Sequence, residues 1–121
     1  MKISRAFLAM SLLLPAGAVA HARDISTCVV AEKFHCAPGA GCQSIKVSVV
    51  VRIDWAKAKY SRCDTQGCDD CDMVTQQGGN YINIVPIPPN GSMAKVALDD
   101  GSFLEVATLM LSTLVSFGTC K

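Results

Sequence analysis

The sequence has little excess charge of either sign. Its 121 residues contain 11 Lys and Arg against 10 Asp and Glu, giving a formal net charge of +1 at pH 7. The basic residues are scattered and form no run. Proteins that bind nucleic acids or anionic lipids do so through concentrated positive charge, so this composition gives no reason to expect either kind of partner.

Signatures of catalysis are also missing. The chain has only two histidines and no G-x-S-x-G elbow, so no Ser-His-Asp set can be identified. We therefore expect no catalytic residues and no cofactor. Aromatic residues make up only 6% of the chain, and we expect most of them to pack in the core or at its rim rather than to cage a ligand: Trp55, Tyr60, Tyr81, Phe103 and Phe117.

The N-terminus reads as a secretory signal peptide. Lys2 and Arg5 precede an apolar run over residues 6–14, and small residues follow up to Ala20. Cleavage is expected after Ala20 or after Ala22. The apolar run is too short to cross a bilayer core of roughly 30 Å, and no longer one follows. We expect a periplasmic or secreted mature chain over residues 21–121, with one domain and no membrane span.

All seven cysteines lie after the signal segment. In an oxidising compartment they indicate a disulfide framework with one thiol left over. Many pairings are open, and loop lengths and strand positions favour Cys28–Cys120, Cys36–Cys42 and Cys63–Cys68. Cys71 is then either free or the link between two chains of a dimer.

Alternating apolar residues predict an all-β fold. The clearest case is residues 45–55, where Ile45, Val47, Val49, Val51, Ile53 and Trp55 share one side. Weaker strand patterns occur at 26–34, 59–63, 73–76, 81–85, 93–98, 102–109 and 113–117, separated by segments rich in Gly, Pro, Asn and Asp. About seven or eight short strands predict a small antiparallel barrel or sandwich.

Residues 103–117 leave a choice between helix and strand. The segment is long enough for a helix and has no Gly or Pro at its middle. It lacks a capping box, however, and its second half is rich in Val, Thr and Ser, which favour strands. We predict a hairpin or one long bent strand.

The cysteine-rich stretch R-C-D-T-Q-G-C-D-D-C-D over residues 62–72 allows a metal site as an alternative. Cys63, Cys68 and Cys71 have the spacing of three iron–sulfur ligands and could instead bind zinc. The favoured interpretation is a turn closed by Cys63–Cys68. The four aspartates of this stretch are expected to be solvated turn residues rather than calcium ligands: Asp64, Asp69, Asp70 and Asp72.

A second metal hypothesis uses the histidines. Cleavage after Ala20 would make His21 the N-terminal residue, which with His35 could supply three nitrogens to Cu²⁺. The alternative is that His35 is only a side chain at the end of a strand.

Two resemblances carry expectations about the whole domain. The segments F-H-C-A-P-G-A-G-C (34–42), Y-S-R-C-D (60–64), G-C-D (67–69), D-G-S-F-L-E-V-A-T (100–108) and V-S-F-G-T-C (115–120) resemble small exported proteins of Gram-negative bacteria that have no assigned function. That resemblance implies a compact β domain and no activity. The tetrapeptide G-G-N-Y (78–81) resembles part of the Ser-Gly-x-x-Tyr motif of C-type lysozyme inhibitors, which are eight-stranded barrels with a disulfide. Gln77 stands where those inhibitors have Ser, and their lysine-containing motif is absent.

The sequence offers one loop as a candidate partner site. Residues 76–81 combine two glycines, amides and Tyr81, which is where a partner protein would contact the chain, at Gly78 and Tyr81. The alternative is that Gly78 and Gly79 only form a hairpin turn while Tyr81 packs inward. The leading functional hypothesis is a non-catalytic binding module, with a metal protein or a lysozyme inhibitor as alternatives.

Overall fold

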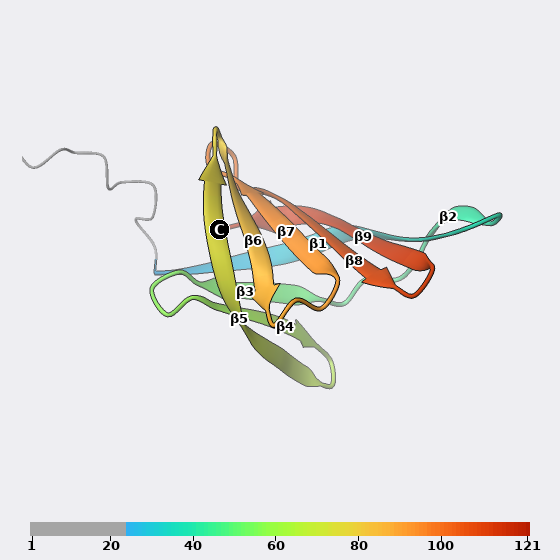
Figure 1. Ribbon diagram of the computed structural model, residues 1–121, viewed down its shortest axis with the longest axis horizontal. Coiled ribbons are helices and arrows are strands. Elements are labelled where there is room, and N and C mark those ends of the chain that lie inside the picture. The colour runs from blue at the N-terminus through green and yellow to red at the C-terminus, as the bar shows by residue number, and fades with distance from the viewer. Residues whose placement is uncertain (1–23) are drawn as a thin grey trace, which may run out of the picture.

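The computed structural model describes residues 24–121, so the predicted signal peptide, its cleavage site and His21 lie outside the described part (Figure 1). Residues 24–121 form nine strands: β1 (Ile25–Ala37), β2 (Gly41–Ser44), β3 (Val50–Asp54), β4 (Lys59–Asp64), β5 (Gly67–Gly78), β6 (Tyr81–Ile87), β7 (Ser92–Ala97), β8 (Ser102–Leu109) and β9 (Ser112–Cys120). The predicted all-β class is confirmed. Within these residues no helix is long and apolar enough to cross a membrane.

Eight of the strands close into a barrel. The order is β1-β3-β4-β5-β6-β7-β8-β9, every neighbouring pair is antiparallel, and β9 pairs back to β1. Closure leaves no free edge along most of the sheet, which protects such a small protein from edge-to-edge aggregation. The ninth strand, β2, pairs only with the last residues of β1 and projects as a hairpin beyond the barrel (Figure 1).

The two ends of the barrel differ in their contents. At one end lie the turns after β3, β5 and β7 and the start of β1, and at the other lie the turns after β4, β6 and β8. Below we call these the closed end and the open end. Most of the apolar core fills the barrel toward the closed end: Cys28, Val30, Val51, Ile53, Ile82, Ile84, Val96 and Phe103.

Barrel closure between β1 and β9 depends on a glycine. Gly118 lies opposite Val30, where β1 has an irregularity between Val30 and Glu32. A Cβ at Gly118 would overlap the carbonyl oxygen of Val29. Only the absence of a side chain therefore lets the last strand approach the first at this level.

Three disulfides reinforce the barrel, and they are the pairs expected from the sequence. Cys28–Cys120 joins the first strand to the last, Cys36–Cys42 spans the β1–β2 hairpin, and Cys63–Cys68 spans the β4–β5 hairpin. Each joins residues that are direct cross-strand partners. Of the cysteines in residues 24–121, only Cys71 is free.

The prediction for residues 45–55 was partly wrong. Only β3 within it is a strand, where Val51 and Ile53 face the core as the alternation indicated. Residues 45–49 instead run back alongside β1, with the Ile45 amide donating to the Lys33 carbonyl at 2.9 Å. Apolar alternation marks which side chains turn inward, but a strand also needs a neighbour with matching register, and β1 has an irregularity between Val30 and Glu32 beside this segment.

The predicted turn closed by Cys63–Cys68 is confirmed as the β4–β5 hairpin, but the placement expected for the aspartates was wrong. Strand β5 begins at Gly67, so three of the aspartates predicted at turn positions lie on a strand: Asp69, Asp70 and Asp72. Only Asp64 adjoins the turn, where it accepts a hydrogen bond from the Gln66 amide at 2.7 Å. In contrast, the strand prediction over residues 103–117 is confirmed as the β8–β9 hairpin, with Met110 at the turn at φ 54°.

Candidate binding site at the open end of the barrel

A polar contact crosses the barrel interior above the apolar core. Tyr60 on β4 donates a 2.5 Å hydrogen bond from its hydroxyl to Glu105 Oε2 on β8. Three strands separate β4 from β8 in either direction around the ring, so the two residues reach each other from opposite walls. Both side chains are buried, Glu105 being only 4% exposed.

Two cations accompany the buried carboxylate. Arg62, two residues along β4 from Tyr60, places Nη2 3.3 Å from Glu105 Oε1, so both carboxylate oxygens have partners. Ser116 on β9 lies directly opposite Glu105, and Lys33 on β1 lies directly opposite Ser116. Burial and the nearby Arg62 lower the pKa of Lys33, and the charge of Glu105 partly offsets this. We call Lys33, Tyr60, Arg62, Glu105 and Ser116 the polar floor.

Tyr60 is the protonated donor of the polar floor. Burial, the negative charge of Glu105 and the hydrogen bond to it all raise the pKa of Tyr60 far above its ordinary value. The hydroxyl therefore stays protonated at neutral pH and acts as a hydrogen-bond donor. Since Glu105 accepts from Tyr60 and pairs with Arg62, the three side chains fix one another's positions.

Above the floor lies a cavity of about 400 Å³ that opens at the open end. Its walls come from the β4–β5 hairpin, the loop between β6 and β7, and the β8–β9 hairpin: Tyr60, Arg62, Asp69, Asp70, Cys71, Pro86, Asn90, Ser92, Glu105, Ala107, Thr108 and Leu109. The mouths of β-barrels are a common place for binding sites, and this volume is within the usual range of roughly 300–1,000 Å³. The cavity therefore combines fixed polar groups with access from outside.

Leu109 in the cavity wall begins an exposed apolar turn between β8 and β9. Leu109, Met110 and Leu111 are 53%, 100% and 84% exposed. We call these three residues the apolar tip. No charged residue occurs between Val106 and Cys120, so the tip has no charge of its own. Large apolar side chains gathered at an exposed tip are typical of interaction sites.

Cys71 lies in the wall of the cavity. Its thiol donates to the Tyr60 carbonyl at 3.5 Å. Burial is the largest cause that raises the pKa of this thiol, and the carboxylates of Asp72 and Asp70 add to it. The thiolate is the form that attacks electrophiles and binds metals, so at neutral pH Cys71 is a poor nucleophile and a poor ligand.

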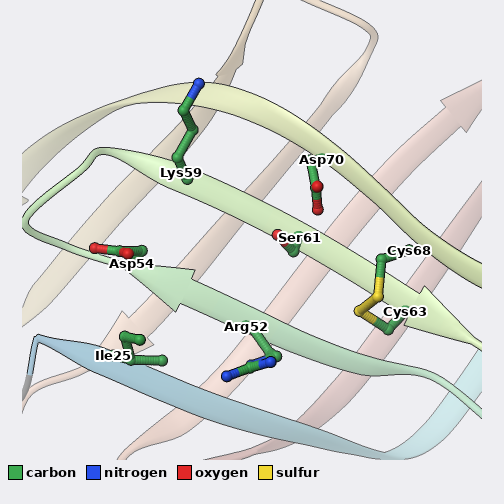
Figure 2. A pocket seen from close by; sticks show the side chains of 8 residues that line it. All are labelled: Ile25, Arg52, Asp54, Lys59, Ser61, Cys63, Cys68 and Asp70. Atoms are coloured by element: carbon green, nitrogen blue, oxygen red, sulfur yellow. A yellow bond between two sulfur atoms is a disulfide. The ribbon is translucent and has the colours of Figure 1, made fainter.

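A second hollow lies on the outer face of the barrel (Figure 2). It has a volume of about 490 Å³ and is lined by Ile25, Arg52, Asp54, Lys59, Ser61, Cys63, Cys68 and Asp70. The lining charges are two positive and two negative, and Lys59 is already paired with Asp72 outside the hollow. This surface thus has little preference for ligands of either charge. Asp70 lines this hollow together with the Cys63–Cys68 disulfide, and it also lines the cavity at the open end (Figure 2).

The structure does not bring the predicted metal ligands together. Cys63 and Cys68 are bonded to each other, so these two sulfurs are not thiolate ligands beside Cys71. Across residues 24–121, no group of three or more His, Cys, Asp or Glu is arranged to hold a metal ion. His35 is on β1 opposite Leu114, and the copper hypothesis that pairs it with His21 extends beyond the described residues.

The loop predicted to meet a partner lies at the closed end, away from the cavity. Gly78 pairs with Tyr81 across a two-residue turn, in which Gly79 has φ 61°. The hairpin-turn alternative is therefore correct for the glycines, but Tyr81 does not pack inward. Its side chain is 50% exposed, with Lys95 Nζ 5.7 Å from the ring centroid. Whether a partner contacts Gly78 and Tyr81 stays a prediction.

Other aromatic predictions divide between core and rim. Tyr60 and Phe103 are buried, and Trp55 packs partly buried against the core with its indole N–H donating to Ser26 Oγ at 2.8 Å. Phe117 is outward and partly exposed, in edge-to-face contact with Phe34.

The sequence interpretation missed the polar floor. One signal was available: in F-L-E-V-A (103–107), Glu105 occupies the same side of the strand as Phe103, where alternation predicts an apolar residue. A charged residue at a core position needs a partner, but the sequence did not tell which strand would supply it.

Comparisons with known proteins give no relative for this chain. No protein-family model matches it, and neither a curated protein nor a solved structure matches it.

Proposed function

We propose that the protein is an exported, non-catalytic binding module that holds part of a partner protein at the open end of its barrel. The observation that carries the proposal is the cavity of about 400 Å³ above the polar floor, with Leu109 of the apolar tip in its wall. The residues of the apolar tip supply area that is favourable to bury, while the fixed polar groups inside supply specificity.

The chemistry of the site supports binding rather than catalysis. The carboxylate of Glu105 is engaged at both oxygens, the pKa of Tyr60 is far above neutral pH, and that of Cys71 is raised. Neither Tyr60 nor Cys71 is poised to exchange a proton or attack a substrate at pH 7. Rigid, preorganised contacts are what a recognition surface requires. The three disulfides support export to an oxidising compartment such as the periplasm.

A selection from a library of displayed random peptides tests this proposal. Enriched peptides would be synthesised and titrated against the wild-type protein and two variants, Leu111→Asp at the open end and Tyr81→Ala at the closed end. Burying a leucine side chain contributes about 1.5–3 kcal/mol, so Leu111→Asp should weaken binding by about tenfold or more. Tyr81→Ala should leave the affinity unchanged.

The controls separate binding from folding. Both substituted side chains are at least half exposed, so circular dichroism and the urea midpoint should match the wild type. If peptides bind equally well to Leu111→Asp and wild type, or if no peptide is enriched, the open end is not the site.

A second candidate function is inhibition of a C-type lysozyme. An eight-stranded barrel with disulfides and an outward, half-exposed Tyr81 fit what that resemblance implies. Titration against a C-type lysozyme tests it directly. Inhibition by the wild type that is lost in Tyr81→Ala would support this function, and no inhibition by the wild type would eliminate it.

A further inference from the structure

One stretch of the otherwise closed sheet has an unpaired edge at the cavity. β5 pairs with β4 from Gly67 to Asp72, but its pairing with β6 begins only at Asp72, opposite Ile87. After Ile87 the chain turns away through Pro88 and Pro89, and proline has no N–H to extend the pairing. Residues 67–71 of β5 therefore have a strand on one side only, within the described chain.

The backbone groups that face this edge can be identified from the alternation of an antiparallel strand. Consecutive residues direct their N–H and C=O groups to opposite edges. The Met73 amide donates to the Ala58 carbonyl, which lies on the β4 side, so Cys71 and Asp69 also face β4. The N–H and C=O groups of Cys68 and Asp70 consequently point to the unpaired edge. The Cα–Cα distance of 4.0 Å between Cys63 and Cys68 supports this assignment for Cys68. So short a distance is typical of a cross-strand pair that exchanges no backbone hydrogen bonds.

The edge carries negative charge. Within the described residues, Lys59 is paired with Asp72 and Arg62 with Glu105, whereas the carboxylates of Asp64, Asp69 and Asp70 have no ion-pair partner. Asp69 lines the cavity, while Asp70 lines both the cavity and the outer hollow shown in Figure 2. A strand lying along this edge would thus meet both carboxylates.

We propose that the unpaired edge of β5 at residues 67–71 takes up an extended, basic segment of a partner protein as an added strand. Addition of a strand to a free sheet edge is an established mode of peptide recognition, in which backbone hydrogen bonds give affinity and alternate side chains give specificity. Cys68 and Asp70 supply the backbone groups, and Asp64, Asp69 and Asp70 select Lys or Arg. The inference rests on the function proposed above and names the chemistry of its partner.

The disulfide gives the edge its rigidity. Cys63–Cys68 ties the hairpin next to the two residues that present the free groups, so the strand conformation exists before the partner arrives. A preformed edge reduces the entropy that binding would otherwise cost.

Fluorescence anisotropy with short labelled peptides tests the proposal. The probe is acetyl-Lys-Thr-Lys-Thr-Lys-amide, compared with the same peptide carrying Glu in place of Lys. Two further versions are N-methylated, one at the Thr residues and one at the Lys residues. In an added strand only one alternate set of amides faces β5, so one N-methylated peptide should lose binding at least tenfold while the other keeps it. The Glu peptide should bind at least tenfold more weakly than the Lys peptide.

A matched pair of protein variants separates the contribution of the backbone N–H of residue 70 from that of its carboxylate. Asp70→Asn and Asp70→Pro both remove the carboxylate, but only the second removes the N–H that faces the free edge. Asp70→Asn should weaken binding of the Lys peptide by roughly two- to fivefold, as expected for one exposed charge. Asp70→Pro should weaken it roughly fivefold more, as expected for one hydrogen bond. An unchanged urea midpoint would verify that Asp70→Pro is folded.

The outcomes distinguish a failure of the strand-addition proposal from a failure of the proposed binding function. If both N-methylated peptides bind alike, or if Asp70→Pro and Asp70→Asn are equivalent, strand addition is refuted. Peptides that still depend on Leu111 would then leave the open end as the binding site. Peptides insensitive to both Leu111→Asp and Asp70→Pro would refute both proposals.

Discussion

Removing the carboxylate of Glu105 should destabilise the protein more than removing any exposed charge. Glu105→Ala takes away the acceptor of the Tyr60 hydroxyl and the counter-ion of Arg62 inside the barrel. Breaking a buried ion pair from one side typically costs about 3–5 kcal/mol. The Arg62 side chain is 27% exposed and can recover some hydration, so we expect the lower end, about 3 kcal/mol. For a domain of this size that is a large share of the total stability.

The hydrogen bond across the barrel can be isolated by a double-mutant cycle. Tyr60→Phe keeps the ring and removes the donor, which should cost about 2 kcal/mol because the acceptor is charged. The same bond is lost in both single variants, so the double variant should be less destabilised than the sum of the two. We expect a coupling energy of about 1.5 kcal/mol, within the range for residues in direct contact.

Equilibrium urea unfolding, followed by the fluorescence of the only tryptophan, Trp55, is a suitable assay because this residue packs against the core. Glu32→Ala is the matched control, since Glu32 is an exposed strand residue on β1 and should change stability by less than about 0.5 kcal/mol. A loss below about 1 kcal/mol for Glu105→Ala, or strictly additive free energies in the cycle, would refute the idea that the polar floor holds the two walls together.

Four further outcomes follow from the fold and the site. Because the pKa of Tyr60 is raised above its ordinary 10.0, the folded chain keeps a proton that the unfolded chain loses above about pH 10. Stability should therefore fall with rising pH above that value, by up to about 1.4 kcal/mol per pH unit. Urea unfolding at pH 9 and 11 should show a larger loss in wild type than in Tyr60→Phe, and an equal loss in both would exclude Tyr60 as the cause. Gly118→Ala should lower the free energy of unfolding by about 1–3 kcal/mol, because the new methyl group has no room between β9 and β1; a wild-type urea midpoint would contradict that packing. Replacing Cys28 and Cys120 with Ala opens a loop of 92 residues and should cost about 4 kcal/mol by calorimetry, whereas a loss under about 1 kcal/mol would exclude a constraining role. Cys71 should react with iodoacetamide at pH 7.4 roughly tenfold more slowly than in the urea-unfolded chain, and equal rates would show that it is not protected.

The sequence alone determined the class of the fold and much of its framework. Short alternating segments between turn residues indicated strands, since period-two burial is a local property of an extended chain. The disulfide pairing could be predicted from the sequence for a related reason. Cys36–Cys42 and Cys63–Cys68 flank short turns, and Cys28 and Cys120 lie at the two ends of a sheet that closes on itself.

The local sequence did not determine the lengths of the strands or the absence of a strand at residues 45–49. The alternation at residues 45–49 resembles that of β3, yet no neighbouring strand is in register with it, whereas the polar residues at the start of β5 pair with β4 despite their weak strand propensity. Pairing depends on what lies alongside, and a hairpin disulfide can hold residues in a strand that their own preferences would not.

Only the tertiary structure brought together the groups of the proposed binding site. Tyr60 and Glu105 are 45 residues apart, and their contact exists because barrel closure sets β4 opposite β8. The same closure put Tyr81 at the end away from the cavity and brought Leu109 of the apolar tip into the cavity wall. The unpaired edge of β5 likewise arises from the point at which β6 stops pairing. The sequence gives the chemistry of each side chain. Which side chains lie close together depends on the order and register of the strands, and these exist only in the folded barrel.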